Sequence, residues 1–363
     1  MNYTNNYPLN TLYFYLTQGC NLKCRHCWLS PKYEEKAETF LSVKTFEFIL
    51  EQGIELGLTG VKLTGGEPLL HPEILELIKI VQKKQLRLTV ETNGVLCSQE
   101  IALAIAQSKA CFVSVSLDAA DEKTHEWMRG VEGSFKQALR GIKNLKAAGI
   151  SPQIIMTLNQ KNKNKIEAII NLAEDLGAHS LKFNIMQPIT RGEKLHTQGE
   201  ALTIEELVVL GKRIENELAK KSKIKLYYDH PPAFKPLGKI FAEDGDGCSY
   251  CGVLGILGVL ADGSYALCGI GSVISELVFG QAEEDSLKDI WEQAPILNQL
   301  RSGLPHKLKG ICGECLMKAS CFGSCIAQNY YLAKNLWAPF WYCELASQKG
   351  LFPKTRLKPA VII

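Results

Sequence analysis

The chain has 363 residues, which exceeds the usual length of a single domain and excludes a small disulfide-stabilised scaffold. Hydrophobic residues make up 46% of the chain and charged residues 22%, so we expect a full hydrophobic core and not intrinsic disorder. Lys and Arg total 41 against 38 Asp and Glu, and the net charge of +3 is too small to require nucleic acid or an anionic membrane as a partner.

The 13 Cys residues point to metal. No apolar stretch reaches the roughly 20 residues that span a bilayer, and the polar start MNYTNNYPLN lacks the features of a signal peptide, so we expect a cytoplasmic protein. Thiols stay reduced in that compartment, which makes metal binding the first explanation for so many Cys. They form a group of three, two isolated residues and a group of eight: Cys20, Cys24 and Cys27; Cys97 and Cys111; Cys248, Cys251, Cys268, Cys312, Cys315, Cys321, Cys325 and Cys343.

These numbers suit iron–sulfur clusters. A [4Fe–4S] cluster is usually held by four thiolates, so eight Cys can saturate two clusters. Three Cys can hold one more cluster and leave one of its irons open.

Strands and helices are expected to alternate through the first half of the chain. The predicted strands cover residues 12–17, 60–63, 86–91, 111–117, 152–158 and 181–185. Stretches with helical periodicity separate them, the first at residues 43–56. Six such β/α units predict a parallel sheet, open or curled into a barrel, with its sites at the carboxyl ends of the strands.

The pattern changes after residue 210. A helix continues to about residue 221 and a short strand covers residues 224–228, after which the prolines of HPPAFKPLG break regular structure. We therefore place a domain boundary between residues 229 and 230. Beyond it, residues 256–268 predict a β-hairpin with its turn at Asp262 and Gly263, and residues 287–300 predict a helix.

The first predicted strand leads into CNLKCRHC, in which Cys20, Cys24 and Cys27 have the spacing CxxxCxxC. Three thiolates on a short loop can bind three irons and leave the fourth to an external chelator. This spacing, with His26 before the third Cys, resembles the radical S-adenosylmethionine (SAM) superfamily. The resemblance implies that SAM binds the open iron and that one-electron reduction cleaves it to a 5′-deoxyadenosyl radical. The alternative is a zinc site with a fourth ligand such as His26 or His71.

The second predicted strand ends in TGGEP. Glycines let the backbone approach a ligand closely, and a carboxylate beside them can bind an ammonium group. Gly65, Gly66 and Glu67 match the GGE motif of the same superfamily, which implies that they receive the amine of SAM. Two glycines by themselves would indicate no more than a tight turn.

The later strand ends offer further contacts to SAM. ETNG follows the third strand and SVSLDA closes the fourth. The resemblance assigns Ser116 and Asp118 to the carboxylate and ribose of SAM, with Arg129 as a second carboxylate partner. The alternative is that Arg129 is an ordinary surface residue without a ligand. Four residues after the fifth and sixth strands, which core packing or capping would also explain, are candidates to flank the adenosine: Thr157 or Asn159, and Met186 or Gln187.

The C-terminal Cys pattern is the most specific motif in the chain. GxxxxC ends at Cys268, and CxxCxxxxxCxxxC runs from Cys312 to Cys325 before Cys343. This pattern resembles the SPASM domain, named for enzymes that mature peptides and sulfatases. The resemblance implies two ligand sets: Cys248, Cys251, Cys268 and Cys325 for auxiliary cluster I, and Cys312, Cys315, Cys321 and Cys343 for auxiliary cluster II. If Cys248 or Cys251 is free, cluster I could contact the substrate instead, and two zinc sites are the alternative to both clusters.

The combined resemblance implies an α/β fold: a (β/α)6 partial TIM barrel over residues 1–229, then a bridging segment and a small Cys-rich SPASM domain of a β-hairpin and helices over residues 230–363. It also implies three [4Fe–4S] clusters, one of them SAM-binding and two auxiliary. The chain would be an oxidoreductase that removes hydrogen from a residue of a ribosomally made precursor peptide.

The reaction type depends on the fate of the substrate radical. Sulfatase maturases carry an acidic residue directly after the Cys of GxxxxC, and Gly269 at that position speaks against sulfatase maturation. Epimerisation needs a hydrogen donor, typically a thiol. Cys97 and Cys111 are the candidate hydrogen donors, but the sequence favours small buried core residues at both positions. We therefore expect a cross-link or backbone remodelling, with epimerisation, or modification of a small molecule such as a haem precursor, as alternatives.

A non-enzymatic iron–sulfur or zinc protein would have no use for GGEP after its second strand. About ten residues precede the first strand, so the leader part of a precursor peptide is expected to bind a separate leader-binding protein or the enzyme itself. An electron donor such as flavodoxin or ferredoxin is the other expected partner. No sequence pattern identifies the peptide, the modified residue or the bond that is formed.

Overall fold

The computed structural model describes residues 7–33, 39–241 and 251–359. One ten-stranded sheet forms its centre, in the order β12-β11-β10-β1-β4-β5-β6-β7-β8-β9. The strands of this sheet are β1 (Thr11–Tyr15), β4 (Gly60–Thr64), β5 (Arg87–Thr92), β6 (Cys111–Ser116), β7 (Gln153–Leu158), β8 (Ser180–Ile185), β9 (Lys225–Tyr228), β10 (Ile256–Val259), β11 (Ser264–Ala266) and β12 (Val278–Gln281). A second, two-stranded sheet pairs β2 (Gly19–Cys20) with β3 (Lys32–Tyr33).

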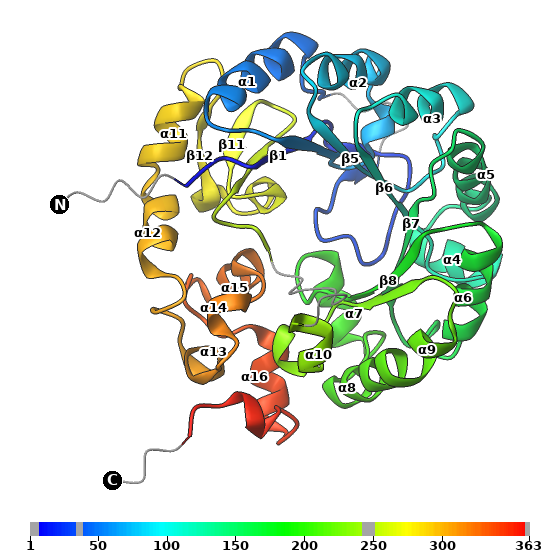
Figure 1. Ribbon diagram of the computed structural model, residues 1–363, viewed down its shortest axis with the longest axis vertical. Coiled ribbons are helices and arrows are strands. Elements are labelled where there is room, and N and C mark those ends of the chain that lie inside the picture. Colours follow the sequence, from blue (N-terminus) through cyan, green and yellow to red (C-terminus); the bar gives the residue numbers. More distant parts are fainter. Residues whose placement is uncertain (1–6, 34–38, 242–250, 360–363) are drawn as a thin grey trace.

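The six predicted strands form the partial barrel, which confirms the expected fold class. Strands β1 and β4 to β8 are parallel neighbours, and β9 adds a seventh parallel strand beside β8. Figure 1 shows the helices of the first half arranged outside the curved row of strands. These helices are α1 (Val43–Glu55), α2 (Ile74–Lys83), α3 (Gln99–Ala106), α4 (Glu122–Arg129), α5 (Ser134–Ala147), α6 (Ile166–Asp175), α7 (Arg191–Thr197), α8 (Ile204–Arg213), α9 (Ala219–Lys221) and α10 (Leu237–Phe241).

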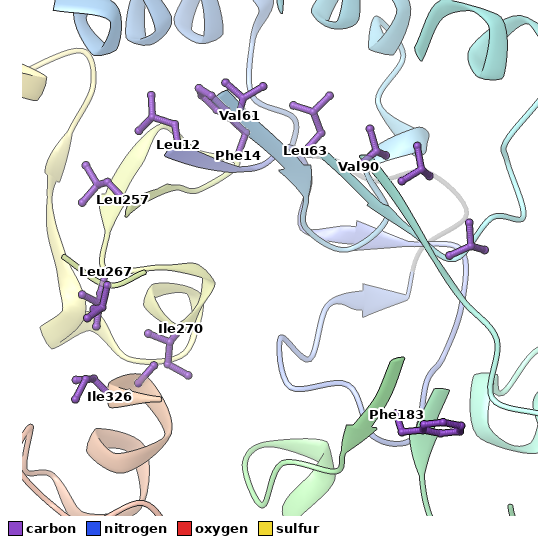
Figure 2. Packing of buried hydrophobic residues seen from close by; sticks show 14 of the residues in the cluster. Leu12, Phe14, Val61, Leu63, Val90, Phe183, Leu257, Leu267, Ile270 and Ile326 are labelled. Carbon is purple, nitrogen blue, oxygen red and sulfur yellow. The ribbon is translucent and has the colours of Figure 1, made fainter. Parts of the chain in front are cut away.

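Alternation along each strand separates the core from the inside of the barrel. Leu12, Phe14 and Leu63 are fully buried and point towards the outer helices, as Figure 2 shows. Residues between them, such as Lys62, face the opposite side because successive side chains of a strand alternate. The barrel interior is therefore polar while the layer between sheet and helices is apolar.

The C-terminal part extends the barrel sheet instead of forming a sheet of its own. β10 pairs in parallel with β1, and β10 and β11 form the predicted hairpin, with Gly263 in its turn at φ +85°. Helices α11 to α16 follow on the side of the molecule opposite α4 to α6 (Figure 1). They are α11 (Leu287–Gln293), α12 (Pro295–Gly303), α13 (Gly310–Glu314), α14 (Lys318–Cys321), α15 (Ile326–Ala333) and α16 (Trp341–Gln348).

Two predicted helices differ from those observed. The single helix predicted over residues 287–300 is wrong, because Pro295 lacks the backbone N–H that would continue α11 and begins α12 instead. The helix that ends at residue 221 is interrupted by a π-helical turn, η2 (Ile214–Leu218). The remaining short turns are 3₁₀ helices: η1 (Pro68–Leu70), η3 (Pro232–Phe234), η4 (Gly269–Ser272), η5 (Ser275–Leu277) and η6 (Lys354–Arg356).

No helix in the described part of the chain has the length and apolar character needed to cross a bilayer.

Candidate cofactor and substrate site

A cavity of about 240 Å³ lies at the carboxyl ends of the barrel strands, and we refer to it as the upper cavity. The loop with the CxxxCxxC motif forms one wall, and the ends of β4 to β8 form the others. It is lined by Tyr15, Cys20, Leu22, Cys24, His26, Cys27, Trp28, Leu29, Pro31, Thr64, Gly65, Gly66, Glu67, Glu91, Thr92, Asn93, Ser114, Ser116, Arg129, Ile155, Thr157, Asn184, Ile185 and Gln187. The first two sequence motifs therefore meet in one place.

The three thiols of the first motif lie close enough to interact electrostatically. Burial and the neighbouring Cys24 raise the pKa of Cys20 and of Cys27. The backbone N–H of Leu22 donates to the sulfur of Cys20 at 3.4 Å. A positive cofactor beside these thiols would favour the thiolate form, which burial alone disfavours.

The GGE loop packs directly against the CxxxCxxC loop. The N–H of Gly66 donates to Thr17 O and the N–H of Glu67 donates to Gly19 O, both at 3.0 Å. A Cβ atom on Gly66 would lie 1.8 Å from Gly19 O, so only glycine allows this approach. Gly65 has a φ of +130°, which also favours glycine.

Glu67 joins the ends of two strands. Its carboxylate accepts hydrogen bonds from the N–H of Leu69 (3.1 Å), the hydroxyl of Thr92 (2.6 Å) and the N–H of Asn93 (2.8 Å). Burial raises the pKa of Glu67 to about 7, although these three donors act in the opposite direction. Three protein donors already bind the Glu67 carboxylate, so its clearest role is to fix the shape of the cavity. An amine of a ligand would bind the same carboxylate beside these donors.

A buried ion pair lies next to the CxxxCxxC motif. Arg129 Nε lies 2.8 Å from Asp118 Oδ2, and both side chains are buried. Arg129 Nη1 also donates to the sulfur of Cys24 at 3.6 Å. The other Asp118 oxygen accepts the N–H of Thr157 at 2.9 Å. Asp118 therefore holds the guanidinium beside Cys24 and the cavity.

We expect Arg129→Met to lower the free energy of unfolding of the cofactor-free protein by about 3–5 kcal/mol, because it leaves the buried Asp118 carboxylate without its counter-ion. Denaturation in urea measures this loss. Lys136→Met is the matched control, since the Lys136–Glu122 pair is exposed and its removal should leave the stability close to that of the parent. A loss for Arg129→Met no larger than for the control would contradict the buried pair.

The predicted SAM contacts divide into two groups. Seven of them line the upper cavity: Gly65, Gly66, Glu67, Ser116, Arg129, Thr157 and Gln187. Asp118, Asn159 and Met186 do not. Asp118 is fully buried in its ion pair, Asn159 caps a turn by accepting the N–H of Lys161, and Met186 packs in a small apolar cluster. The contacts predicted for these three residues with the ribose or adenosine stay predictions, and for the adenosine the alternatives Thr157 and Gln187 line the cavity.

Sequence reasoning missed several polar residues of the upper cavity. Ser114, Asn184 and Glu91 line it beside the predicted positions. Ser114 lies two residues before Ser116 on β6, so strict alternation along the strand would have identified it. The start of α7 was also missed: the hydroxyl of Thr190 donates to Cys27 O at 3.0 Å, and Arg191 donates to Cys24 O at 3.3 Å.

The C-terminal thiols form two groups. Cys251, Cys268 and Cys325 interact with one another, and burial together with Cys325 raises the pKa of Cys268 to about 12. Cys248, the fourth member of the set predicted for cluster I, lies outside the described residues. The second group matches the set predicted for cluster II, with mutual electrostatic effects among Cys312, Cys315, Cys321 and Cys343. That these thiols bind iron stays a prediction.

The donor set fits iron–sulfur clusters better than zinc. Within residues 7–33, 39–241 and 251–359, no three Cys, His, Asp or Glu side chains converge on a single ion position. Cluster thiolates each bind a different iron, so they need not converge in this way. His71 is unsuited as a fourth zinc ligand, because Nε2 contacts Leu41 O at 2.8 Å and Nδ1 accepts the N–H of Glu73.

The two isolated Cys lie away from the upper cavity. Cys97 is 3% exposed in the hydrophobic core, and burial raises its pKa to about 12. Cys111 begins β6 at the amino end of the strand, opposite the cavity. Neither lines the upper cavity, so neither is placed to donate hydrogen to a substrate radical there.

Two family models match the chain. The model of the radical SAM superfamily matches residues 14–173, and that of SPASM, an iron–sulfur cluster-binding domain, matches residues 248–316. An AdoMet-dependent heme synthase from Methanosarcina barkeri is 30% identical over 330 residues, which cover 87% of this chain and 90% of that protein. The mycofactocin maturase MftC of Mycobacterium ulcerans is 29% identical over 333 residues, covering 89% and 85%.

A solved structure has the same architecture. Streptococcus suis SuiB bound to its precursor peptide SuiA aligns with a TM-score of 0.72 at 19% identity, covering 93% of this chain and 76% of SuiB. At this identity the likeness shows the fold alone, a partial barrel followed by a SPASM domain. With the full-length relatives, the two family models and the meeting of the CxxxCxxC and GGE motifs, the chain belongs to the radical SAM superfamily as a SPASM-containing enzyme that binds SAM, a [4Fe–4S] cluster and further iron–sulfur clusters.

Proposed function

We propose that this enzyme modifies a ribosomally made peptide by removing hydrogen from one of its residues, leading to a cross-link or backbone remodelling. The observation that carries this proposal is a series of adjoining cavities that are lined by the barrel strands and, in the middle, by the C-terminal part of the chain. The middle cavity has about 240 Å³ and shares Ile185 and Gln187 with the upper cavity. The lower cavity has about 360 Å³ and shares Lys182 and Asp229 with the middle one. Cys251 and Cys325 of the predicted cluster I also line the middle cavity, so the peptide would pass beside that cluster on its way to the upper cavity.

The charges inside the barrel also favour a peptide. Lys62 Nζ lies 2.8 Å from Glu91, and Lys182 Nζ lies 3.2 Å from Asp229. These lysines are therefore already neutralised by carboxylates of the protein. A tetrapyrrole with several carboxylates would need several unpaired cations, and only Lys235 in the lower cavity has no ion-pair partner among the described residues, whereas a peptide backbone needs only polar partners.

The residues that would hold the cofactors are those of the predicted motifs. Cys20, Cys24 and Cys27 would bind the first cluster, with Gly65 and Gly66 leaving room for SAM beside it. When bound, SAM and the clusters supply the radical that takes a hydrogen atom from the substrate and the acceptor for a further electron. The protein's part is to bind the peptide, exclude water and orient one C–H bond.

The absence of a free thiol favours oxidation over epimerisation. Within the described residues, the only thiols that line the upper and middle cavities are those assigned to clusters. A substrate radical there has no thiol donor from which to recover hydrogen. Loss of a second electron and a proton, which gives a new bond, is the outcome that we propose.

The direct test is an anaerobic reaction of the reconstituted enzyme with SAM, dithionite and short peptides encoded beside its gene. We expect mass spectrometry to find a peptide that has lost a pair of hydrogens, together with 5′-deoxyadenosine. An unchanged mass with an inverted residue would indicate epimerisation. Release of 5′-deoxyadenosine with no peptide changed would contradict the proposal.

We expect Cys315→Ala to leave most SAM cleavage intact and to remove the modified product. Cys315 lies with Cys312, Cys321 and Cys343 in the C-terminal domain, outside the upper cavity. The measurement compares 5′-deoxyadenosine with product in the same reaction. Cys111→Ala, a change at a partly buried thiol of the barrel, is the control and should keep both. Product formation by Cys315→Ala at the parent rate would rule out the role of this group.

A second candidate function rests on the relative from Methanosarcina barkeri, which is named a heme synthase and is 30% identical over most of both chains. Under this alternative the substrate is a tetrapyrrole. Incubation with iron coproporphyrin III, SAM and dithionite distinguishes the two, because conversion of the tetrapyrrole would replace the peptide proposal.

A further inference from the structure

The lower cavity opens at the amino ends of the strands, away from the cofactor motifs. It is lined by Phe112, Gln153, His179, Lys182, Tyr227, Tyr228, Asp229 and Lys235. Phe112 and His179 are exposed and stack edge to face with ring centroids 5.5 Å apart, so they form the rim. Lys235 is only 7% exposed and also lines the cavity.

Among the described residues that line this cavity, Lys235 is the cation without an ion-pair partner. Lys182 is paired with Asp229 at 3.2 Å, whereas none of the described residues forms an ion pair with the Lys235 ammonium. Arg356 adds further positive charge behind it by donating to the carbonyl of Lys235 at 3.3 Å. Charging a Lys side chain this deeply buried is costly unless an anion or water reaches its ammonium group, and the cavity provides the space for one.

We infer that the lower cavity binds a carboxylate of the substrate, with Lys235 as its counter-ion and Phe112 and Tyr227 beside the adjoining apolar part. Under the proposed function, on which this source depends, the carboxylate belongs to an acidic side chain or to the C-terminus of the peptide. The site selects for one negative charge, since Lys182 and Asp229 cancel each other.

Fluorine NMR on the full-length reconstituted enzyme, without SAM or reductant, tests the site. The probe is 4-fluorophenylacetate, which joins a carboxylate to an aromatic ring, and its neutral match is 4-fluorophenylacetamide. We expect the wild type to broaden the carboxylate signal much more than that of the amide. Lys235→Met should weaken carboxylate binding about tenfold, the usual scale for a charged hydrogen bond. Equal binding of both probes would overturn the inference.

Lys220→Met, at an exposed position at the end of the helix before β9, is the matched control and should bind as the wild type does. Asp229→Asn provides an independent variant in case Lys235→Met does not fold. Removing the carboxylate from the cavity should strengthen binding of the anionic probe. Unchanged or weaker binding by Asp229→Asn, or full binding by Lys235→Met, would contradict the role of these charges.

Competition identifies the source of the carboxylate. We expect the tripeptide acetyl-Gly-Glu-Gly-amide to displace the probe and its Gln counterpart not to do so. Displacement by iron coproporphyrin III but not by the acidic tripeptide would overturn the peptide source while keeping the carboxylate site. Because this binding needs no SAM cleavage, its outcome is independent of the activity test of the proposed function.

Discussion

Cys24→Ala is expected to abolish SAM cleavage, with 5′-deoxyadenosine falling to the level of a reaction without enzyme. The side chain of Cys24 lines the upper cavity, and its sulfur accepts a hydrogen bond from Arg129 at 3.6 Å. Removing one of three thiols leaves too few ligands to hold a cluster with one open iron. Chromatography of the anaerobic reaction with SAM and dithionite measures the loss, and iron and sulfide analysis reports the missing cluster.

Cys97→Ala is the matched control for this substitution, because it removes an equally buried thiol from the hydrophobic core. It should keep SAM cleavage and the full iron content, at the cost of some stability. SAM cleavage by Cys24→Ala at a measurable fraction of the parent rate would contradict the assignment of the CxxxCxxC motif to the SAM-binding cluster. Loss of cleavage in both variants would point to misfolding instead.

Gly66→Ala has the second largest expected effect. The added methyl group would lie 1.8 Å from Gly19 O and 2.6 Å from Gly19 C, both of which are backbone atoms. Backbone cannot move aside as a flexible side chain can, so the GGE loop and the CxxxCxxC loop must separate. We expect SAM binding to weaken by at least about a hundredfold, since the cavity wall that both loops form is displaced. Equilibrium dialysis with labelled SAM measures this directly.

Gly238→Ala is the control for the change from glycine to alanine. No heavy atom lies within 4 Å of the position its Cβ would take, and the residue lies in the short helix α10. SAM binding should be unchanged there. Parent-like SAM binding by Gly66→Ala would mean that the two loops do not meet as closely as the hydrogen bond from Glu67 to Gly19 implies.

The order of the strands and both cofactor motifs could be predicted from the sequence. The strand predicted at residues 111–117 is observed as β6 (Cys111–Ser116), and that at 181–185 as β8 (Ser180–Ile185). Alternation of apolar residues is a local property, so a sequence carries it without reference to the rest of the chain. The spacing of Cys20, Cys24 and Cys27 and the adjacent glycines of GGEP are equally local.

The roles of single polar residues depended on the tertiary structure. Asp118 follows a strand end, as the SAM contacts do, yet it lies behind the cavity and holds Arg129. The difference arises because closure of the sheet decides which side chains near a strand end face the cavity and which face the helices. An ion pair between positions 118 and 129 also depends on where α4 packs, which no spacing encodes.

The fold class, the family and the residues of the cofactor motifs could be predicted from the amino-acid sequence, because these depend on spacing along the chain. The extension of the barrel sheet by the C-terminal hairpin, through β10 and β1, became visible in the folded chain. The same is true of the adjoining cavities and of Lys235, which is buried without a counter-ion among the described residues. These features join residues far apart in sequence, and their positions follow from packing and charge compensation instead of local periodicity.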